Sequence, residues 1–249
     1  MAATPRVRLD VVVTERGLTA SRERARALIL AGRVRVDGAV VNKAGTMIAA
    51  GALVSLDEPD FPWVGRGGVK LAHALDAFGI AVTGREALDI GASTGGFTDV
   101  LLQRGATRVV ALDVGHGQLD WRLRSDARVI TLEHRNARDL DLGWLPGPVD
   151  VVTIDVSFIS LRLILPAVPG VMHRDADLVA LVKPQFEAGR DEVGPGGLVL
   201  DRAVHDAVLA RVSAAAAECG LGRVAMTPSP ITGATGNQEY FLHLRRDHP

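Results

Sequence analysis

The sequence is poor in the residues that mark several protein classes. It has one cysteine, Cys219, which excludes an internal disulfide and any zinc site built from cysteines. Its seven histidines are scattered without the spacing of metal ligands, so we expect no metal site. No apolar run approaches the roughly 18 residues of a membrane span, and no signal peptide opens the chain. These absences predict a soluble, cytoplasmic protein with no membrane partner.

Lysine is scarce as well. Only Lys43, Lys70 and Lys183 occur among 28 basic residues, so arginine carries almost all of the positive charge. An ammonium group is compact and can lose its proton, which a guanidinium in a protein does not do. The scarcity suggests that the retained lysines have roles that arginine cannot fill.

What is present divides the chain in two. With 249 residues, of which 47% are hydrophobic, the chain suits a small domain followed by a medium one. Residues 1–50 hold nine lysines and arginines against four acids, whereas the rest of the chain is net negative. A basic front on a neutral-to-acidic body indicates that the front binds a polyanion.

The front is predicted to be a small α+β unit. A first helix is expected to end at Gly17, and Thr19 is expected to cap a second helix that runs to Ala31. The alternating strand that follows ends in a hairpin turn at Asp37 and Gly38. Basic side chains that point outward from this helix and strand would form one face suited to phosphates.

The order of residues in this unit resembles the S4 RNA-binding domain. The matching segments are Leu9-Asp10, Gly17-Leu18, Ser21-Arg22, Leu28-Ile29, Val34 to Gly38, and Val41-Asn42-Lys43. The resemblance implies binding to structured RNA. The candidate RNA contacts are Arg22, Arg24, Arg26, Arg33 and Lys43, together with Arg66 in the junction beyond this unit.

The junction at 57–70 contains two prolines and three glycines, which break the periodicity and mark a domain boundary. We therefore expect an S4-like domain at 1–60, a linker at 61–70 and a second domain at 71–249.

The second domain opens with a buried strand that ends at Ile90, followed by a glycine-rich turn at 91–96 and a helix from Phe97. Glycines let the backbone N–H groups of such a turn approach a ligand closely. Asp89 is expected to face the same crevice, and Asp113 ends the next strand, where a ribose diol would lie in a doubly wound sheet. The spacing G-x-S-x-G-G differs from the dinucleotide pattern and suits S-adenosylmethionine, which has no phosphate. Binding of a different nucleotide is the alternative.

Further predicted strands bring polar residues to the same edge of the sheet. Asn136 follows the third strand, where a loop would meet an adenine ring, Asp155 ends the fourth and Lys183 ends the fifth. We expect an α/β fold of the Rossmann-like methyltransferase type, with a doubly wound, mostly parallel sheet of seven strands. The candidate cofactor contacts are Asp89, Gly91, Ser93, Gly95, Gly96, Phe97, Asp113, Asn136, Ala137 and Asp155.

Four residues match the catalytic set of FtsJ-type ribose 2′-O-methyltransferases, Lys–Asp–Lys–Glu in that chain order. They are Lys70, Asp155, Lys183 and Glu239. Together with the segments at 63–71, 88–99, 182–187 and 236–239, they resemble the TlyA family of ribosomal RNA 2′-O-methyltransferases, also called hemolysin A. The resemblance implies methyl transfer from S-adenosylmethionine to a ribose 2′-hydroxyl, with a cytidine of ribosomal RNA as the expected target and ribosomal subunits as partners. Gly65 departs from the family pattern, in which a serine is more usual.

The chemistry suits these residues. Methyl transfer is an in-line displacement, and the ribose hydroxyl is a poor nucleophile until its proton leaves. Lys183 is the candidate base, but only as a neutral amine. Asp155 and Glu239 would stabilise its charged form, whereas Lys70 and desolvation oppose this. The alternative is that Lys183 only orients the hydroxyl and that the proton passes to Asp155 or water.

Three other functional classes are alternatives to a methyltransferase. The segment from Gly91 to Gly95 fits the G-x-S-x-G elbow of a serine hydrolase, with Asp155 and either His205 or His243 as partners. However, no oxyanion segment precedes it, and the elbow would fall on the first strand of the domain. A membrane-active hemolysin lacks a spanning or long amphipathic segment here. A non-catalytic RNA-binding or ribosome-assembly factor is the remaining alternative. In each case we expect a monomer.

Overall fold

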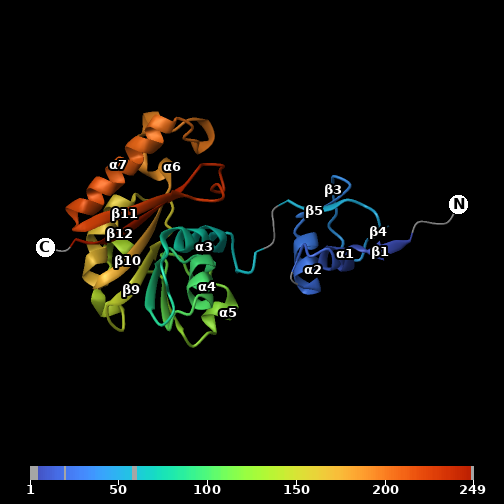
Figure 1. Cartoon of the computed structure of the whole chain (residues 1–249), viewed down its shortest axis with the longest axis horizontal. Helices are drawn as coiled ribbons and strands as arrows, with labels where there is room; N and C mark the ends of the chain where they lie inside the picture. The colour runs from blue at the N-terminus through green and yellow to red at the C-terminus, as the bar shows by residue number, and fades with distance from the viewer. Residues whose placement is uncertain (1–4, 20, 58–60, 248–249) are drawn as a thin grey trace. The chain divides into compact units, whose positions relative to one another are not determined.

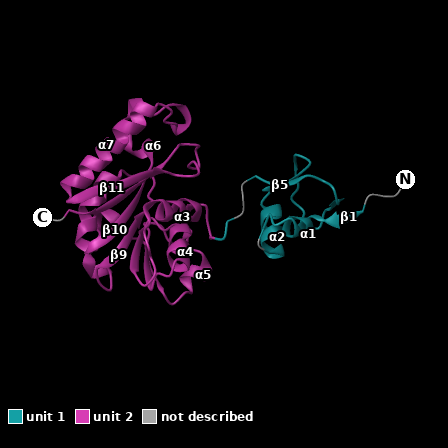
Figure 2. Cartoon of the chain, in the orientation of Figure 1, with its two compact units in different colours: residues 1–62 teal, residues 63–249 magenta. Residues whose placement is uncertain are grey.

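The computed structural model describes residues 5–19, 21–57 and 61–247. The chain forms two compact units, residues 1–62 and 63–249 (Figure 2). Each unit has a buried apolar core of its own. The end predicted for the first domain, residue 60, lies outside the described residues.

In the first unit, helices pack against short strands (Figure 1). Leu9, Val13, Ala25, Ile29 and Val34 form its core and are all 0% exposed. The α1–α2 pair supplies most of this core, because both helices turn their apolar stripe toward the strands. The elements are β1 (Arg6–Arg8), α1 (Leu9–Glu15), α2 (Arg22–Leu30), β2 (Val34–Val36), β3 (Ala39–Val40), β4 (Met47–Ala49) and β5 (Val54–Leu56).

Two local predictions for this unit have different outcomes. The N-cap of α2 is Ser21, whose side chain accepts a hydrogen bond from the Arg24 backbone N–H at 3.2 Å. The prediction that Thr19 caps this helix is wrong, because the Thr19 hydroxyl donates to the Ser21 carbonyl at 3.1 Å. The hairpin is confirmed: Asp37 and Gly38 join β2 to β3 with φ of 50° and 83°.

The second unit is built on a seven-stranded sheet in the order β11-β12-β10-β9-β6-β7-β8 (Figure 1). β12 is antiparallel to both of its neighbours, and the other pairs are parallel. The predicted doubly wound, mostly parallel fold is therefore confirmed. The strands are β6 (Glu86–Ile90), β7 (Arg108–Leu112), β8 (Val129–Leu132), β9 (Val149–Ile154), β10 (Met172–Val182), β11 (Leu221–Pro228) and β12 (Tyr240–Arg246).

Helices cover both faces of this sheet. Leu71 of α3 and Leu101 of α4 enter one buried cluster, and Val208 of α7 enters the other. Side chains alternate along a strand, so Ala87 of β6 joins the first cluster and Leu88 the second. The α-helices are α3 (Gly67–Phe78), α4 (Gly96–Gln103), α5 (Trp121–Arg124), α6 (Pro184–Glu187) and α7 (Arg202–Glu218). The 3-10 helices are η1 (Ala137–Asp139), η2 (Leu142–Trp144), η3 (Leu161–Leu163), η4 (Leu165–Val171), η5 (Arg190–Glu192) and η6 (Pro195–Gly197).

The strand order reverses at β6, which has β7 on one side and β9 on the other. In open α/β sheets the ligand crevice lies at such a reversal, outside the carboxyl ends of the strands. Here the Asp155 N–H donates to the Ile90 carbonyl at 2.9 Å, which holds the ends of β9 and β6 together.

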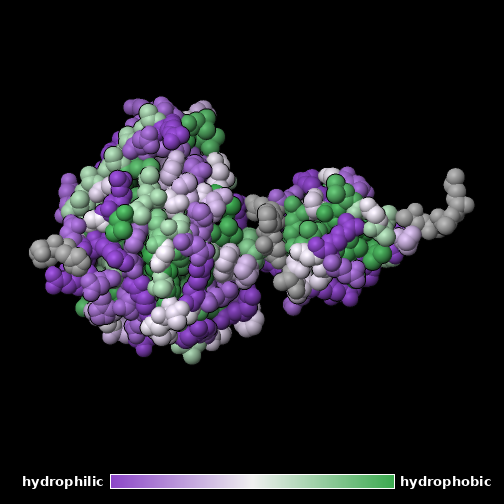
Figure 3. Space-filling model, in the orientation of Figure 1, coloured by the Kyte–Doolittle hydropathy of each residue, from purple (hydrophilic) through white to green (hydrophobic). Residues whose placement is uncertain are grey.

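Hydrophilic residues cover most of the surface in view in Figure 3, with hydrophobic residues between them. Some large apolar side chains are nevertheless exposed. In the second unit Phe158 is 90% exposed and Leu200 84% exposed. Phe158 follows the carboxyl end of β9, so this exposed aromatic ring lies at the edge of the sheet where the strand order predicts a ligand crevice.

Candidate active site

The turn after β6 depends on glycine at two positions. Gly91 has φ of 85°, and a Cβ there would overlap the carbonyl oxygen of Asp155. Gly95 has φ of 98°, and a Cβ there would overlap the side chain of Leu123. Glycine tolerates positive φ and close backbone approach, so the turn can lie directly against β9.

A cavity of about 460 Å³ opens beside this turn. Its volume lies within the usual range for a small-molecule or cofactor site. Apolar and polar side chains share its wall, which suits a ligand with an aromatic ring and a polar sugar. It is lined by Ile90, Gly91, Ser93, Leu112, Asp113, Val114, Gln118, Arg135, Asn136, Ala137, Asp155, Val156, Ser157, Phe158, Ile159 and Ile164.

The structure brings six of the ten predicted cofactor residues to this cavity. These are Gly91, Ser93, Asp113, Asn136, Ala137 and Asp155. Three others are buried and do not line the cavity: Gly95, Gly96 and Phe97, where the turn leads into α4. Gly96 allows the start of α3 to approach, because a Cβ there would come within 3.0 Å of the Gly68 nitrogen.

The prediction that Asp89 faces the ligand crevice is wrong. Asp89 is 0% exposed and accepts hydrogen bonds from the hydroxyls of Thr98, at 2.7 Å, and Thr153, at 3.0 Å. Burial raises the pKa of Asp89 to about 7, against the opposing effect of the two hydroxyls. Asp89 therefore ties β6 to α4 and β9 and supports the turn from the interior.

Asp113 holds the other side of the cavity in shape. One carboxylate oxygen accepts the Ser93 N–H at 2.8 Å and the other accepts the Gly115 N–H at 2.7 Å. The first bond fixes Ser93 in a left-handed conformation, with φ of 47°. The Ser93 hydroxyl lies 3.2 Å from Gln118. Asp113 thus connects the glycine turn to the end of β7, where the sequence predicted a ribose contact.

Two lysine–carboxylate pairs stand at this edge of the sheet. Lys70 Nζ lies 2.5 Å from Glu239 Oε2 in a buried ion pair. Lys183 Nζ lies 2.6 Å from Asp155 Oδ1 in an ion pair that lacks the angle of a hydrogen bond, and it donates to the Ser157 hydroxyl at 2.9 Å. The four predicted catalytic residues therefore form two ion pairs, Lys70 with Glu239 and Lys183 with Asp155.

The fold explains why residues so distant in sequence meet. Asp155 and Lys183 follow the carboxyl ends of the parallel strands β9 and β10. β12 runs the opposite way, so Glu239 at its amino end lies at the same edge, next to the Val182–Tyr240 pair. Lys70 lies near the start of α3.

Small residues make room for this arrangement. A Cβ on Gly67 would meet the Phe97 ring at 3.3 Å and the Asp155 Oδ2 atom at 3.9 Å. A Cβ on Gly233 would overlap the Glu239 carboxylate. Gly233 therefore leaves space for the Glu239 carboxylate, and Gly67 leaves space for the Phe97 ring.

An aromatic hollow adjoins the cavity beside the glycine turn, and the sequence analysis did not predict it. It has a volume of about 540 Å³ and is lined by Arg138, Phe158, Ile159, Ser160, Leu163 and Phe186. The Phe158 and Phe186 ring centroids are 5.1 Å apart. Phe158 has φ of 63°, a left-handed conformation that a bulky residue rarely adopts. The available signal was position: Phe158 and Phe186 each lie three residues after a predicted catalytic residue.

The serine hydrolase alternative is inconsistent with the structure. The Ser93 hydroxyl bonds to Gln118 rather than to an imidazole. His205 bonds to Tyr240 at 2.8 Å and to the Val199 carbonyl at 2.7 Å. His243 bonds to Asp177 at 2.7 Å, in the middle of β10 and away from the carboxyl end of that strand. Neither histidine is available as a base for Ser93.

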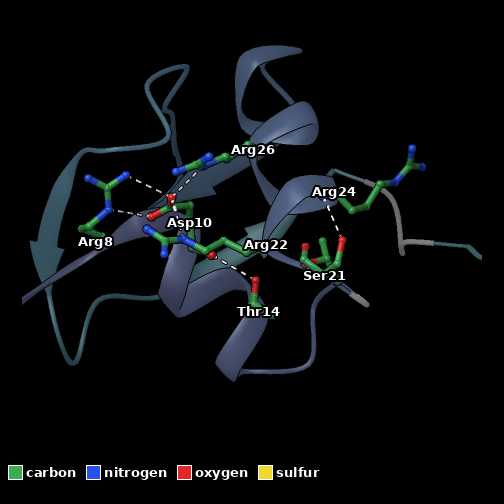
Figure 4. A network of polar contacts seen from close by, with 8 residues as sticks. Arg8, Asp10, Thr14, Ser21, Arg22, Arg24 and Arg26 are labelled. Atoms are coloured by element: carbon green, nitrogen blue, oxygen red, sulfur yellow. Dashed lines mark hydrogen bonds and ion pairs between the residues drawn. The ribbon is translucent and has the colours of Figure 1, made fainter.

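The basic face of the first unit has an acid at its centre (Figure 4). Asp10 is 0% exposed and accepts hydrogen bonds from Arg8 at 3.0 Å, Arg22 at 3.0 Å and Arg26 at 3.1 Å. Bonding to the Arg8 guanidinium is the largest of several effects that hold the pKa of Asp10 well below its usual range. Arg22 and Arg26 are still about half exposed, at 49% and 54% of their side chains. Their ends can therefore reach a ligand while Asp10 fixes their direction.

The other predicted RNA contacts are placed as follows. The Arg24 guanidinium lies 5.7 Å from the centroid of the Phe61 ring, and Arg33 and Lys43 are exposed. Arg66, in the second unit, donates to the Thr232 carbonyl at 3.3 Å.

Asp10→Asn is expected to lower the free energy of unfolding of the first unit by about 1–3 kcal/mol at pH 7, less than for a fully buried pair because the arginines are half exposed. The folded pKa of Asp10 is lowered, so its contribution is present above the unfolded value of about 3.9 and is lost as the pH falls through the folded value. The difference between wild type and variant should therefore shrink in acid. Thermal unfolding of the full chain at several pH values measures this. Glu23→Gln removes an exposed acid from the same unit and should be near neutral; an equal loss in both variants would contradict the role of Asp10.

The switch-point cavity and the glycine turn, on a sheet of this order, define a Rossmann-like methyltransferase. The FtsJ-like methyltransferase family matches residues 63–246, and the S4 domain matches residues 7–54. The chain is 51% identical over 241 residues to the 16S/23S rRNA (cytidine-2′-O)-methyltransferase TlyA of Mycobacterium tuberculosis, covering 96% of this chain and 90% of that protein. The chain belongs to the TlyA family of FtsJ-like methyltransferases, so the predicted family and enzyme class are confirmed.

Two further similarities agree with this assignment. Hemolysin A of Brachyspira hyodysenteriae is 42% identical over 96% of this chain and 99% of that protein. A solved structure of a protein from Streptococcus thermophilus, described as a hemolysin, has a TM-score of 0.77 and 43% identity over 98% of this chain and 90% of its own. An S-adenosylmethionine-dependent methyltransferase from Mesorhizobium loti shares the fold alone, with a TM-score of 0.54 and 17% identity over 73% of this chain and all of its own.

The described residues contain neither a membrane-spanning helix nor a cluster of metal ligands. No helix in this part of the chain is long and apolar enough to cross a membrane. No group of three or more His, Cys, Asp or Glu side chains within the same residues could hold a metal ion.

Proposed function

We infer that this protein transfers a methyl group from S-adenosylmethionine to a ribose 2′-hydroxyl of ribosomal RNA, with a cytidine as the target. The observation that carries this proposal is the meeting of the Lys70–Glu239 and Lys183–Asp155 pairs at the edge of the sheet that holds the cavity. The name of the Mycobacterium tuberculosis relative supports the choice of reaction and of cytidine.

The residues around the cavity suit S-adenosylmethionine. Asp113 would accept hydrogen bonds from the ribose diol, and Asn136 and Ala137 would lie along the adenine ring. Ile90 and Leu112 offer the apolar surface that a nucleoside needs. The cofactor supplies an electrophilic methyl group when bound.

The lysine pairs act on the acceptor hydroxyl. Lys183 and Asp155 would hold the ribose 2′-hydroxyl in line with the methyl group. The Lys183–Asp155 pair would accept the hydroxyl proton, so that the oxygen could take the methyl group that bound S-adenosylmethionine would supply. Lys70 and Glu239, which are buried together, would fix the position of the neighbouring ribose atoms.

The S4 domain would supply RNA affinity. Arg22, Arg24, Arg26, Arg33 and Lys43 are its proposed phosphate contacts, and Arg66 is the proposed contact in the second unit. Such contacts act mainly through charge, so binding should weaken as salt increases. We propose ribosomal subunits as partners of a monomeric enzyme, and the cytoplasm as its compartment because ribosomal RNA is the substrate.

The aromatic hollow is the proposed site of the target base. Because Phe158 and Phe186 each lie three residues after a member of the Lys183–Asp155 pair, a base stacked on the exposed Phe158 ring would place its ribose beside that pair. Phe158→Ala is expected to lower kcat/KM for RNA by about 10- to 100-fold, since stacking on one aromatic contributes about 1–3 kcal/mol per base. Methyl-transfer kinetics at varied RNA concentration measure this, with cofactor affinity determined separately.

Leu200→Ala serves as the control, because it removes an equally exposed apolar side chain. If Phe158→Ala weakened cofactor binding alone and left RNA kinetics intact, the hollow would not be the base site.

The proposed reaction is tested with purified protein, tritiated S-adenosylmethionine, both ribosomal subunits and protein-free ribosomal RNA. Label should enter RNA and survive alkali within a 2′-O-methyl dinucleotide, because methylation of the 2′-oxygen blocks cleavage there. Cofactor binding without transfer to any of these RNAs would contradict the proposal and favour a non-catalytic RNA-binding factor.

A further inference from the structure

Ser157 has a place in the site that the lysine–carboxylate pairs do not explain. It lies two residues after Asp155, on the wall of the cofactor cavity, and its hydroxyl accepts a hydrogen bond from Lys183 Nζ at 2.9 Å. The same nitrogen lies 2.6 Å from Asp155 Oδ1. The Lys183 side chain is only 11% exposed, so these neighbours dominate its surroundings.

The tetrahedral geometry of Lys183 Nζ means that its hydrogen bond to Ser157 can orient it. A lysine nitrogen is tetrahedral, with three positions besides the bond to its own carbon. Ser157 takes one of them through a hydrogen bond, whereas Asp155 lies 2.6 Å away in an ion pair without hydrogen-bond geometry. With the ion pair alone the flexible lysine stem could rotate, because attraction between charges has little directional preference. The directional bond to Ser157 fixes the orientation of the nitrogen and hence the position left for the ribose hydroxyl.

The loop that carries Ser157 is itself held in place. Glu187 accepts the Ser160 hydroxyl and the Leu161 N–H, both at 2.6 Å, and is only 6% exposed. Glu187 belongs to α6, which begins directly after Lys183. The segment from Asp155 to Leu161 is therefore bonded to β6 at its start and to the Lys183 segment at its end.

We propose that Ser157 is a positioning residue for methyl transfer, which orients Lys183 Nζ toward the acceptor hydroxyl. This inference rests on the proposed function. Ser157 makes no bond to the transferred methyl group and takes no proton. It acts through the direction of Lys183, and Glu187 keeps its loop in register with that lysine.

Kinetics of Ser157→Ala test the proposal. Loss of the Ser157 acceptor should lower kcat by about 10- to 100-fold, while KM for RNA and cofactor affinity stay within about twofold. Ser157→Thr keeps the hydroxyl and should restore most of the rate. Ser213→Ala removes a hydroxyl that accepts from Arg223 at 3.3 Å, away from the site, and should leave the rate unchanged. An unchanged kcat in Ser157→Ala, or a raised KM alone, would overturn the proposal.

A second measurement separates this inference from the reaction itself. The chain has only three lysines, so selective ¹³C labelling gives few Cε–Hε NMR signals, each assignable by a Lys→Arg variant. Ser157→Ala should move the Lys183 signal of the free protein and leave that of Lys70 in place. If no signal moves, Ser157 does not orient Lys183 in solution. If the signal moves but wild type methylates no RNA, the proposed function fails and the positioning contact stands.

Discussion

Methyl transfer by Lys183→Ala should fall by roughly a thousandfold or more, with cofactor affinity almost unchanged. The variant removes the group that faces both Asp155 and Ser157, and loss of a positioned proton-transfer group typically costs about 10²- to 10⁴-fold. The cavity wall does not include Lys183, so cofactor binding should survive. Single-turnover transfer from tritiated cofactor measures the rate, and calorimetric titration measures the affinity.

Two further variants test whether the loss is specific to Lys183 and whether Lys183 acts as a base. Arg174→Ala removes an exposed cation near the amino end of the same strand, β10, and should have wild-type activity. Lys183→Arg keeps the positive charge but cannot give a neutral amine, so it should be almost as inactive as alanine. Substantial activity in the arginine variant would show that Lys183 orients the hydroxyl by charge and does not take its proton.

Gly91→Ala should destabilise the second unit by about 2–5 kcal/mol and abolish cofactor binding. The new Cβ would overlap the Asp155 carbonyl oxygen at a position where φ is 85°. Strained backbone contributes about 1–3 kcal/mol of that loss, and overpacking in a rigid interior contributes a similar amount. Relief of the overlap would move β9 away from β6, and with it Asp155.

Gly84→Ala is the matched control, because Gly84 has φ of 79° and nothing within 4 Å of a built Cβ. It carries the same backbone strain without the overlap, and its expected loss is about 1–2 kcal/mol. Urea unfolding compares the two variants. Equal losses of unfolding free energy in the two variants, or intact cofactor binding in Gly91→Ala, would contradict this prediction. The first result would mean that stability does not need the close approach of β6 and β9, and the second that cofactor binding does not need it.

Much of the site could be predicted because it lies at strand ends. Apolar runs that stop at Asp155 and Lys183 locate those side chains without any knowledge of packing, since parallel strands share one ligand-binding edge. The glycine turn is visible for the same reason. These features depend on local order alone.

The features that were predicted wrongly or not at all depend on tertiary packing, which the sequence pattern does not show. Asp89 also lies at a strand end, but its alternation points it at Thr98 and Thr153, and only the assembled helix and strand show that these hydroxyls satisfy it. Thr19 and Ser21 are both competent caps, and the chain path selects Ser21. Sequence also did not reveal that Asp10 would gather three arginines, because the partners come from two elements.

The buried pair that completes the site joins residues 169 positions apart, Lys70 near the beginning of the second unit and Glu239 near its end. Glu239 leads into β12, which is inserted between β10 and β11 and arrives last in synthesis. Until β12 is made, the edges of β10 and β11 that it pairs with are therefore open. Such long-range closure is slow to form and exposes strand edges to aggregation. Lys70 and Glu239 meet only when β12 has joined the sheet, so we expect a chain cut before Glu239 to lack methyl-transfer activity.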